Sequence, residues 1–488
     1  MGKQKSIEIK QDLTMIPLES ITFINEDNLR YLQPIKAFYL NDNGSFLYRY
    51  EVNVLCPELE KIIKENMYFK FVKDSNLGST FLYVYKDGYY QLMSECEFKG
   101  MIMEYIPYEI RKTKDVDEIY KLLLMENDFY VDNNVLNSDY NYINFKNGIL
   151  DLRTMKMIEH TPHMMFTVQI PVNYVPLEDC KYGKVFEKYM NDLVSGDDVM
   201  KQSLLEAMGL VLSNIPGYFT KKSILMIGSK DCGKTQIKKL LTELIGIRYA
   251  SSIELSKMNG NNFATSELYN KRLAGSNDMQ YTTVADMGIF KQLTGGDPIS
   301  IEFKGKGSFS YIYTGIIWFL ANDFPKFSGK REDAVYQRFM VMPCEHVVPK
   351  SEQDPELVKK MLKESEYIVS LCINNLLNLI KRKYQFEESP RMKNGLKKYE
   401  VSNNTILQFV EECCEVDNNI PPNDRMKVSD FKKYYRIWCR DSGIKNLGLK
   451  NEDIENYLKS KYGTEIKKVS LYYLTNIKLK EGIDLTFS

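Results

Sequence analysis

The order of apolar and polar positions predicts that the middle of this chain alternates between strands and helices. Residues 223–227 (SILMI) form a continuous apolar run with the length of a buried strand, and residues 236–245 repeat apolar side chains at helical spacing. A second apolar run at residues 314–321 (TGIIWFLA) predicts another buried strand, whereas residues 271–278 (KRLAGSND) predict a weaker one. The alternation continues to about residue 345, and it indicates an α/β fold.

The flanking regions have shorter elements and breaks that suggest separate domains. Short alternating strands are expected at residues 81–85 and 142–145, and helices at residues 184–213, about 355–383 and 403–416. Pro216-Gly217 ends the first of these helices just before the central alternation begins. We therefore expect five parts: an N-terminal module of unassigned role at 1–65, an α/β and helical domain at 66–220, the core at 221–390, a helical connector at 391–420 and a compact C-terminal domain at 421–488.

Composition limits the classes of protein to consider. The 488 residues are too many for one core, and the 65 basic residues balance the 65 acidic ones, so any nucleic-acid surface must come from local charge asymmetry. The nine cysteines are scattered without a C-x-x-C pair, and His160-x-x-His163 lacks partners at metal-ligand spacing. No secretory leader follows Met1, and no apolar run is long enough to span a membrane, so a soluble cytoplasmic protein is expected.

Residues 228–235 (GSKDCGKT) carry the clearest chemical signal in the chain. They spell G-x-x-x-x-G-K-T between a predicted strand and a predicted helix, which is the context that a phosphate-binding loop requires. Backbone N–H groups of such a loop surround the β-phosphate, Lys234 reaches the β and γ oxygens, and the Thr235 hydroxyl ligates Mg²⁺. We therefore predict that ATP and Mg²⁺ bind at Gly228, Ser229, Lys230, Asp231, Cys232, Gly233, Lys234, Thr235 and Gln236.

Two strand ends downstream offer candidate partners for the phosphates. Asp278 ends the weaker strand, where a carboxylate can bind Mg²⁺ through water and polarise an attacking water. Asn322 ends the strongly apolar strand, where an amide can contact the γ-phosphate. By these residues alone, Asp278 is equally well an ordinary strand-end carboxylate, and Asn322 an ordinary turn residue.

A hairpin is expected between these two strands. Residues 299–303 and 309–313 alternate as two strands around Gly305-Lys306-Gly307, which places Lys304 and Lys306 near the tip. A solvated hairpin would also explain such a pair of lysines.

Taken in order, these motifs resemble superfamily 3 helicases of the AAA+ class. The likeness is closer to the phage, plasmid and poxvirus primase-helicase group, and within it to the replication initiators of staphylococcal mobile islands. It covers most of the chain from about residue 70. The matching stretches are residues 142–151 (YINFKNGILD) and 160–174, which resemble the domain that precedes the helicase, and then 263–274, 291–297, the hairpin, 317–322 and 335–343 (VYQRFMVMP).

The resemblance implies a hexameric ring that hydrolyses ATP at its subunit interfaces. Lys234 and Thr235 would hold phosphate and Mg²⁺, Asp278 would position water and bind the metal, and Asn322 would sense the γ-phosphate. Arg338 of a neighbouring subunit would act as an arginine finger, while Lys304 and Lys306 would pull one DNA strand 3′ to 5′. Asp278 stands where the group usually has Glu, and Gln337 where it often has Arg, so Arg331 remains a competing finger.

The C-terminal segment predicts a second DNA contact. Helices are expected at residues 428–439 and 451–462, followed by two strands at 465–469 and 471–477, and Phe431 and Trp438 share one face of the first helix. From Arg425 onward there are fourteen Lys and Arg against eight Asp and Glu, a net charge of +6. This segment resembles the winged-helix domain that ends helicases of this group, which would bind origin duplex. A basic domain that binds protein is the alternative.

The likeness therefore implies an origin-binding DNA helicase that initiates replication. The N-terminal 65 residues are too few for a primase domain, so any primase would be a separate partner. Two rival functions remain open from the sequence: a DNA-binding regulator that uses ATP as an assembly switch, and an AAA+ machine that remodels proteins.

Overall fold

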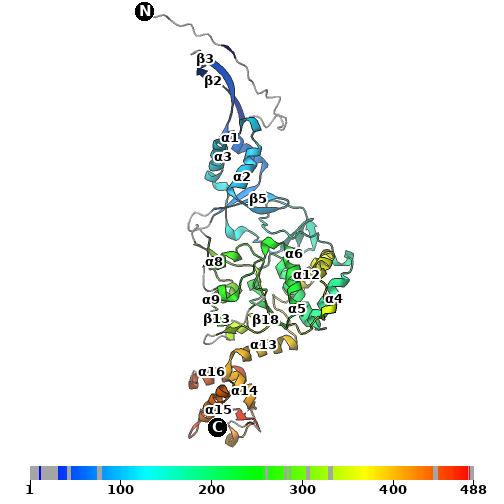
Figure 1. The fold of residues 1–488 in the computed structure, drawn as a ribbon, viewed down its shortest axis with the longest axis vertical. Helices are drawn as coiled ribbons and strands as arrows, with labels where there is room; N and C mark the ends of the chain where they lie inside the picture. The colour runs from blue at the N-terminus through cyan, green and yellow to red at the C-terminus, as the bar shows by residue number, and fades with distance from the viewer. Residues whose placement is uncertain are drawn as a thin grey trace, which may run out of the picture.

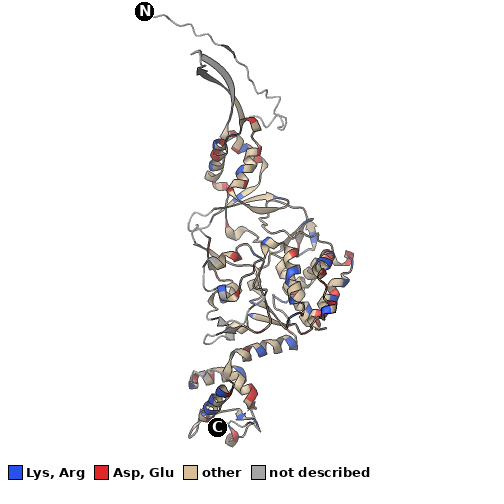
Figure 2. Ribbon diagram, viewed as in Figure 1, with Lys and Arg blue, Asp and Glu red and all other residues tan. Residues whose placement is uncertain are grey.

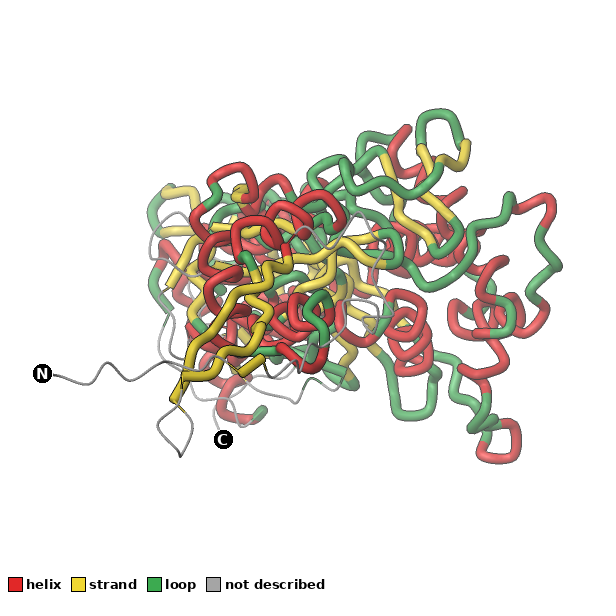
Figure 3. The backbone as a smooth tube through the Cα atoms, turned by 90° about the horizontal axis from the view of Figure 1, so that it is seen from above, coloured by secondary structure: helices red, strands yellow, loops and turns green. Residues whose placement is uncertain are grey.

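The computed structural model arranges the chain as three packed regions along one long axis. It describes residues 10–11, 31–40, 46–73, 80–258, 262–277, 279, 283–284, 287–303, 308–327, 333–442, 449–481 and 483. The N-terminal strands and helices lie at one end, the core in the middle and the C-terminal helices at the other end (Figure 1). Seen along this axis, the helices and loops of the core extend to one side, beyond the N-terminal strands (Figure 3).

The core is built on a four-stranded parallel sheet. Its strand order is β12-β16-β11-β18, and the strands span Leu273–Ala274, Ile316–Ala321, Ser223–Ile227 and Phe339–Pro343. All residues of these strands are buried, as expected for a parallel sheet that is covered on both faces. The expected α/β class is confirmed, and the two predicted apolar strands correspond to β11 and β16.

Alternate residues of β11 enter two separate hydrophobic clusters. Ile224 and Met226 face a cluster that includes helices α5, α6 and α12, which span Asp198–Leu212, Lys234–Ile245 and Ser365–Lys381. Leu225 and Ile227 face the opposite cluster, to which α9, α13 and the hairpin β14–β15 contribute; these span Gly288–Gly295, Pro390–Asn403, Ile299–Glu302 and Ser308–Tyr311. The period of two along a strand therefore fixes which helices cover which face.

Smaller elements complete the core. They are α7 (Leu255–Met258), α8 (Asn262–Thr265), β13 (Thr283–Val284), β17 (Lys326–Phe327), α10 (Asp333–Tyr336) and α11 (Leu357–Leu362). The short 3-10 helices η7 (Gly217–Phe219) and η9 (Ser266–Leu268) lead toward β11 and β12.

The N-terminal region joins a hairpin to a second sheet and three helices. The hairpin consists of β2 (Leu32–Leu40) and β3 (Phe46–Val54), with the short β1 (Lys10–Gln11) beside β3. The sheet has the order β6-β5-β4-β7, with strands Tyr89–Met93, Thr80–Lys86, Phe69–Lys73 and Tyr130–Asp132. Helices α1 (Cys56–Asn66), α2 (Glu95–Glu104) and α3 (Thr113–Met125) pack with it in one cluster. That cluster includes Leu59 and Phe69, so it crosses the expected boundary at residues 65 and 66.

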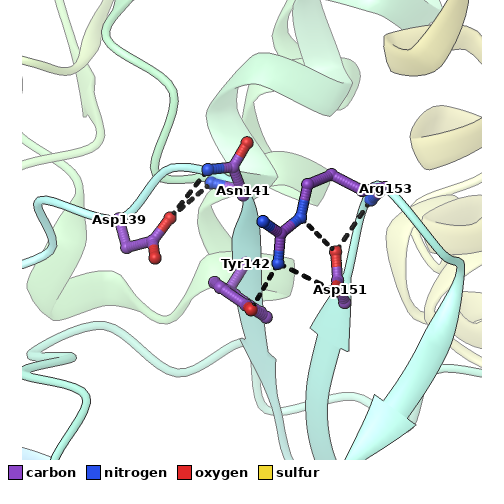
Figure 4. A network of polar contacts seen from close by, with 5 residues as sticks. All are labelled: Asp139, Asn141, Tyr142, Asp151 and Arg153. Carbon is purple, nitrogen blue, oxygen red and sulfur yellow. Dashed lines mark hydrogen bonds and ion pairs between the residues drawn. The ribbon is translucent and has the colours of Figure 1, made fainter.

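A small antiparallel sheet links this region to the core. Its strands are β8 (Tyr142–Phe145), β9 (Gly148–Asp151) and β10 (Lys156–Ile158). Arg153 holds the sheet from one end, because its guanidinium donates to both carboxylate oxygens of Asp151 at 3.0 Å and to the hydroxyl of Tyr142 at 2.5 Å (Figure 4). These bonds lower the pKa of Asp151.

The helix expected at residues 184–213 is two helices, α4 (Lys184–Val194) and α5. Ser195 adopts a left-handed conformation with φ 51°, and Gly196 follows with φ 74°. The chain therefore turns between α4 and α5. The side chain of Asp197 then accepts the N–H of Met200 and caps α5. Apolar spacing continues across the turn because both helices pack on the same core, which explains why the pattern read as one helix.

The C-terminal region is a separate packed unit. It contains α14 (Thr405–Cys413), β19 (Cys414–Val416), α15 (Val428–Asp441), α16 (Asn451–Tyr462), β20 (Ile466–Lys468), β21 (Tyr472–Leu474) and β22 (Ile477–Leu479). β19 pairs antiparallel with β22, and α14 shares the hydrophobic cluster of α15 and α16. A unit drawn from residue 421 would lack α14 and β19, so the packed unit begins at Thr405.

Several basic residues lie on α15, as the blue segments of the C-terminal region show (Figure 2). Phe431, Tyr435 and Trp438 are buried, as the sequence predicted for one face of this helix. Lys433, Arg436 and Arg440 are exposed and recur at helical spacing on another face. Among the described residues, no helix combines the length and the apolarity needed to cross a membrane.

Candidate nucleotide-binding site

The glycine-rich loop leaves β11 and enters α6, the order that its chemistry requires. Asp231 and Gly233 have φ of 66° and 86°, so the loop turns through left-handed conformations before Lys234 begins the helix. A Cβ at Gly228 would lie 1.9 Å from the carbonyl oxygen of Cys344, so only glycine fits there. The glycines at positions 228 and 233 are thus required by the backbone of the loop itself, independently of any ligand.

Contacts from distant parts of the chain hold the loop. The N–H of Cys344 donates to Ile227 at 2.7 Å, and the N–H of Val348 donates to the carbonyl of Asp231 at 3.0 Å. The hydroxyl of Tyr189, from α4, donates to the carbonyl of Gly233 at 2.9 Å. Sequence reasoning missed these three supports, since nothing in their spacing relates them to the loop.

The loop leaves its own N–H groups for a ligand. Within the described part of the chain, the backbone N–H groups of residues 229–233 donate to no backbone carbonyl. Ser229, Lys230 and Asp231 are exposed, and Gly228, Gly233, Thr235 and Gln236 are half-buried, whereas Cys232 and Lys234 are buried. This backbone, together with the N-terminus of α6, fits the oxygens of a polyphosphate.

Lys234 and Asn322 meet at this edge of the sheet although 88 residues separate them. The ammonium of Lys234 donates to the carbonyls of Gly228 at 2.6 Å and Ser229 at 2.8 Å, and to Oδ1 of Asn322 at 3.3 Å. Asn322 follows β16, which lies next to β11 in the sheet. Parallel neighbours bring their carboxyl ends to one edge, so a loop lysine and a strand-end amide meet there.

The candidate acid, Asp278, lies outside the described residues. Its neighbour Met279 is described, and the N–H of Met279 donates to the carbonyl of Leu320 at 2.9 Å, close to Asn322. The strand β12 that leads toward Asp278 pairs parallel with β16. Lys304 and Lys306 at the tip of the hairpin, and the competing finger Arg331, also lie outside the described residues.

Two cysteines lie together at the loop: Cys232 belongs to the loop, and Cys344 follows β18. Cys232 is buried, and a hydrogen bond from the Cys344 thiol, together with the nearby ammonium of Lys234, lowers the pKa of Cys232 to about 6. The same hydrogen bond and burial raise the pKa of Cys344 well above its usual value. The Lys234 ammonium lies 3.4 Å from the Cys232 sulfur.

Lys238 is a buried lysine that the sequence did not single out. It lies on α6, and its ammonium donates to the carbonyl of Gly275 and, at 2.8 Å, to the carbonyl of Trp318. It therefore joins the helix of the phosphate loop to the residue after β12 and to the middle of β16. Burial lowers the pKa of Lys238 to about 7.

Replacing Lys238 by Met should slow ATP turnover more than it weakens nucleotide binding. The change removes the bonds that set α6 against the strands leading to Asp278 and Asn322, and a small misplacement of reacting groups costs kcat about tenfold to a hundredfold. Steady-state kinetics and the affinity for a non-hydrolysable ATP analogue would separate the two effects. Lys239→Met, at the exposed neighbouring position, is the control; equal effects of both changes would contradict a specific role for Lys238.

Arg338 lies at the amino ends of the parallel strands, whereas the loop lies at their carboxyl ends. Its carbonyl accepts the N–H of Ser223 at the start of β11, whereas the loop follows Ile227 at its end. Five strand residues separate the two ends by roughly 16 Å. The Arg338 guanidinium donates to the carbonyl of Lys291 at 3.1 Å and to the Thr294 hydroxyl at 2.9 Å, both on α9 just before the hairpin. The backbone of Arg338 therefore lies at the end of the strands away from the loop of its own chain.

Two family models match parts of the chain. The family described as "D5 N terminal like" matches residues 46–195, and a family of unknown function (DUF5906) matches residues 226–338. The first match covers residues 142–151 and 160–174, which resemble the domain preceding the helicase. It also covers Tyr189, whose hydroxyl donates to the loop. The second covers the loop, Asn322, the hairpin and Arg338.

No curated protein matches the chain. Three structures of the NrS-1 C-terminal region are similar to it, with TM-scores of 0.48, 0.45 and 0.44 and identities of 11%, 12% and 12%; each comparison covers 86% of this chain and 98% of that one. These TM-scores are too low to establish a common fold.

Proposed function

We propose that the chain is an ATP-dependent DNA helicase that initiates replication. The observation that carries the proposal is the contact between Lys234 and Asn322 at the edge where β11 and β16 end. This contact joins a phosphate loop to a strand-end amide, which is the pairing that a nucleotide-sensing motor needs. The match of residues 46–195 to a "D5 N terminal like" family supports the resemblance to the primase-helicase group.

The loop and its neighbours suit the hydrolysis of ATP. The N–H groups of the loop and the ammonium of Lys234 would bind the β and γ oxygens and stabilise charge in the transition state. Thr235 and Asp278 would hold Mg²⁺, which neutralises phosphate charge when bound. Asp278 would also orient the attacking water, and Asn322, already beside Lys234, would contact the γ-phosphate.

The position of Arg338 supports hydrolysis at an interface between subunits. Since the backbone of Arg338 lies at the end of the strands away from its own loop, a contact with nucleotide is proposed to come from a second copy of the chain. Its bonds to α9 also link it to the element that leads into the hairpin. In a hexameric ring, a change at the nucleotide could thus reach the lysines Lys304 and Lys306, which would grip a single strand and move it 3′ to 5′.

Mixing two inactive variants would test the role of Arg338. Arg338→Ala and Lys234→Ala subunits should each lack ATPase activity, but a mixture should regain part of it because some interfaces pair an intact loop with an intact finger. The measurement is ATP turnover across mixing ratios, with assembly checked by light scattering. Absence of recovery at every ratio, with assembly intact, would count against Arg338 and turn attention to Arg331.

The C-terminal unit is proposed to recognise origin duplex. Its order of α14, β19, α15, α16 and the hairpin β20–β21, with β22 returning to β19, supports a winged-helix arrangement. The exposed basic face of α15 and the net charge of +6 from Arg425 onward support contact with phosphates.

Strand displacement on a forked duplex tests the proposed function directly. With ATP and Mg²⁺ the wild-type chain should release the labelled strand, and with a non-hydrolysable analogue it should not. ATP turnover that DNA stimulates without any strand release would point instead to an ATP-switched DNA-binding regulator.

A further inference from the structure

A groove of about 550 Å³ lies between the N-terminal region and the core, beside β15 of the hairpin. One wall comes from β4 and the segment after β7, and includes Lys73 and Tyr140. The other wall comes from η7, from the residues before β12 and from β15, and includes Phe219, Lys271 and Ile312. Its volume is that of a small-ligand site.

Aromatic rings line this groove, with Tyr140 exposed and Tyr218 and Phe219 half-buried. Tyr140 is 39% exposed, and its ring packs edge-on against Phe219 at 5.4 Å. Phe219 packs edge-on against Tyr218 at the same distance. Ile312, at the end of β15, is 45% exposed. Flat apolar faces of this kind stack with nucleic-acid bases whatever their sequence.

The loop that carries Tyr140 is fixed on both sides. The carboxylate of Asp139 accepts the N–H and the side-chain amide of Asn141 at 3.1 and 3.0 Å, which forms a tight turn around Tyr140 (Figure 4). Tyr142 is held by Arg153 and by the amide of Asn214, which donates to its carbonyl. A ring held in place loses little conformational entropy when a ligand stacks on it.

Positive charge gathers at the same groove although the whole chain is neutral. Its lining includes three basic side chains, Lys73, Lys271 and Arg272, and one carboxylate, that of Asp132. Arg272 is buried, and its hydrogen bonds within the described part of the chain go to the carbonyls of Leu210, Ile215 and Thr314 and to the Thr314 hydroxyl. With no carboxylate among these acceptors, its charge is not neutralised there, and burial lowers its pKa to about 10. The groove is therefore lined by more basic than acidic side chains.

Exposed polar groups complete the lining. Asn134, Ser138 and Ser310 are exposed within the groove, and they can donate to and accept from base edges. Rings, amides, hydroxyls and a net positive charge together match a ligand with flat aromatic bases on an anionic backbone.

We propose that this groove binds a segment of single-stranded nucleic acid, with bases on Tyr140 and Phe219 and phosphates near Lys73 and Lys271. The inference rests on the proposed function in one respect: the groove shares β15 with the hairpin that bears Lys304 and Lys306, so a strand could pass from one to the other. It adds a second contact with the strand, made by the region that precedes the core.

Binding of a fluorescein-labelled oligothymidylate of about twenty nucleotides, measured by anisotropy without ATP, tests the proposal. The full chain with Tyr140→Leu and Lys73→Gln should bind about tenfold more weakly, and the slope of affinity against salt should become shallower. The matched control replaces an exposed tyrosine and an exposed lysine away from the groove, as Tyr108→Leu and Lys86→Gln, and should bind like the wild type. Equal binding by the groove variant and the wild type would overturn the inference.

Photo-crosslinking gives a second readout that does not depend on the variants. An oligonucleotide containing 5-iododeoxyuridine should crosslink to a peptide that holds Tyr140 or Phe219, and crosslinks confined to other peptides would overturn the inference. Competition by thymidine monophosphate as strong as by the oligonucleotide would also overturn it, in favour of a free-nucleotide site. If the groove variant instead fails to assemble while each subunit binds DNA normally, the groove is a contact between subunits and the inference is wrong.

The outcome is separable from that of the proposed function. Loss of DNA binding in Lys304→Ala with Lys306→Ala, with normal binding by the groove variant, would overturn the groove and leave the helicase proposal standing. Conversely, a chain that binds the strand at the groove without hydrolysing ATP would retain the groove and overturn the helicase.

Discussion

Replacing Lys234 by Ala is expected to lower kcat for ATP hydrolysis by about a hundredfold to a thousandfold. The change removes the buried ammonium that the loop surrounds and that contacts Asn322, so charge developing on the transferred phosphoryl group loses its closest cation. The measurement is phosphate release at saturating ATP, with and without single-stranded DNA. Strand displacement should be lost together with turnover.

Two controls separate this chemical loss from a loss of structure. Lys239→Ala removes an exposed lysine from the same helix and should hydrolyse ATP like the wild type. Because Lys234 also binds the carbonyls of Gly228 and Ser229, the melting temperature of Lys234→Ala must be compared with that of the wild type. A stable Lys234→Ala chain with normal turnover would show that ATP is hydrolysed elsewhere.

Removing the C-terminal unit is expected to abolish the choice of DNA sequence while leaving the motor intact. The chain should end at Asn403, the last residue of α13, since Tyr399 of that helix belongs to the core cluster whereas α14 belongs to the C-terminal one. The truncated chain keeps the loop, Asn322, the hairpin and Arg338. Specific complexes with DNA are typically tighter than non-specific ones by about 4–10 kcal/mol, so the loss should be large.

Selection from a pool of random duplexes measures this effect without knowledge of the origin. The full chain should enrich a shared sequence, and the chain ending at Asn403 should enrich none while still hydrolysing ATP. A chain ending at Asn418 is a useful comparison. It keeps α14 and β19 but lacks β22, which pairs with β19, and lacks α15 and α16, which share a hydrophobic cluster with α14. It should aggregate more readily than the shorter chain. Continued enrichment by the chain ending at Asn403 would place recognition in the N-terminal region.

The sequence by itself determined the elements whose signals are local. The apolar runs at β11 and β16 correspond to buried strands, because a fully covered strand must be apolar at every position. The glycines of the phosphate loop could be identified from their spacing. Gly233 has φ 86°, which favours glycine whatever its neighbours, whereas Gly228 must be glycine because the carbonyl oxygen of Cys344 lies where a Cβ would be. The buried face of α15 followed from helical spacing in the same way.

Only the tertiary structure decided which distant residues meet. That Tyr189, Cys344 and Val348 support the loop, and that Lys238 joins three elements, depends on strand order and helix packing, which leave no periodic trace in the sequence. The turn at Ser195 was hidden because both flanking helices share one core. The start of the C-terminal unit was likewise set by the pairing of β19 with β22, a contact across more than sixty residues, whereas the polar stretch after β19 reads locally as a linker.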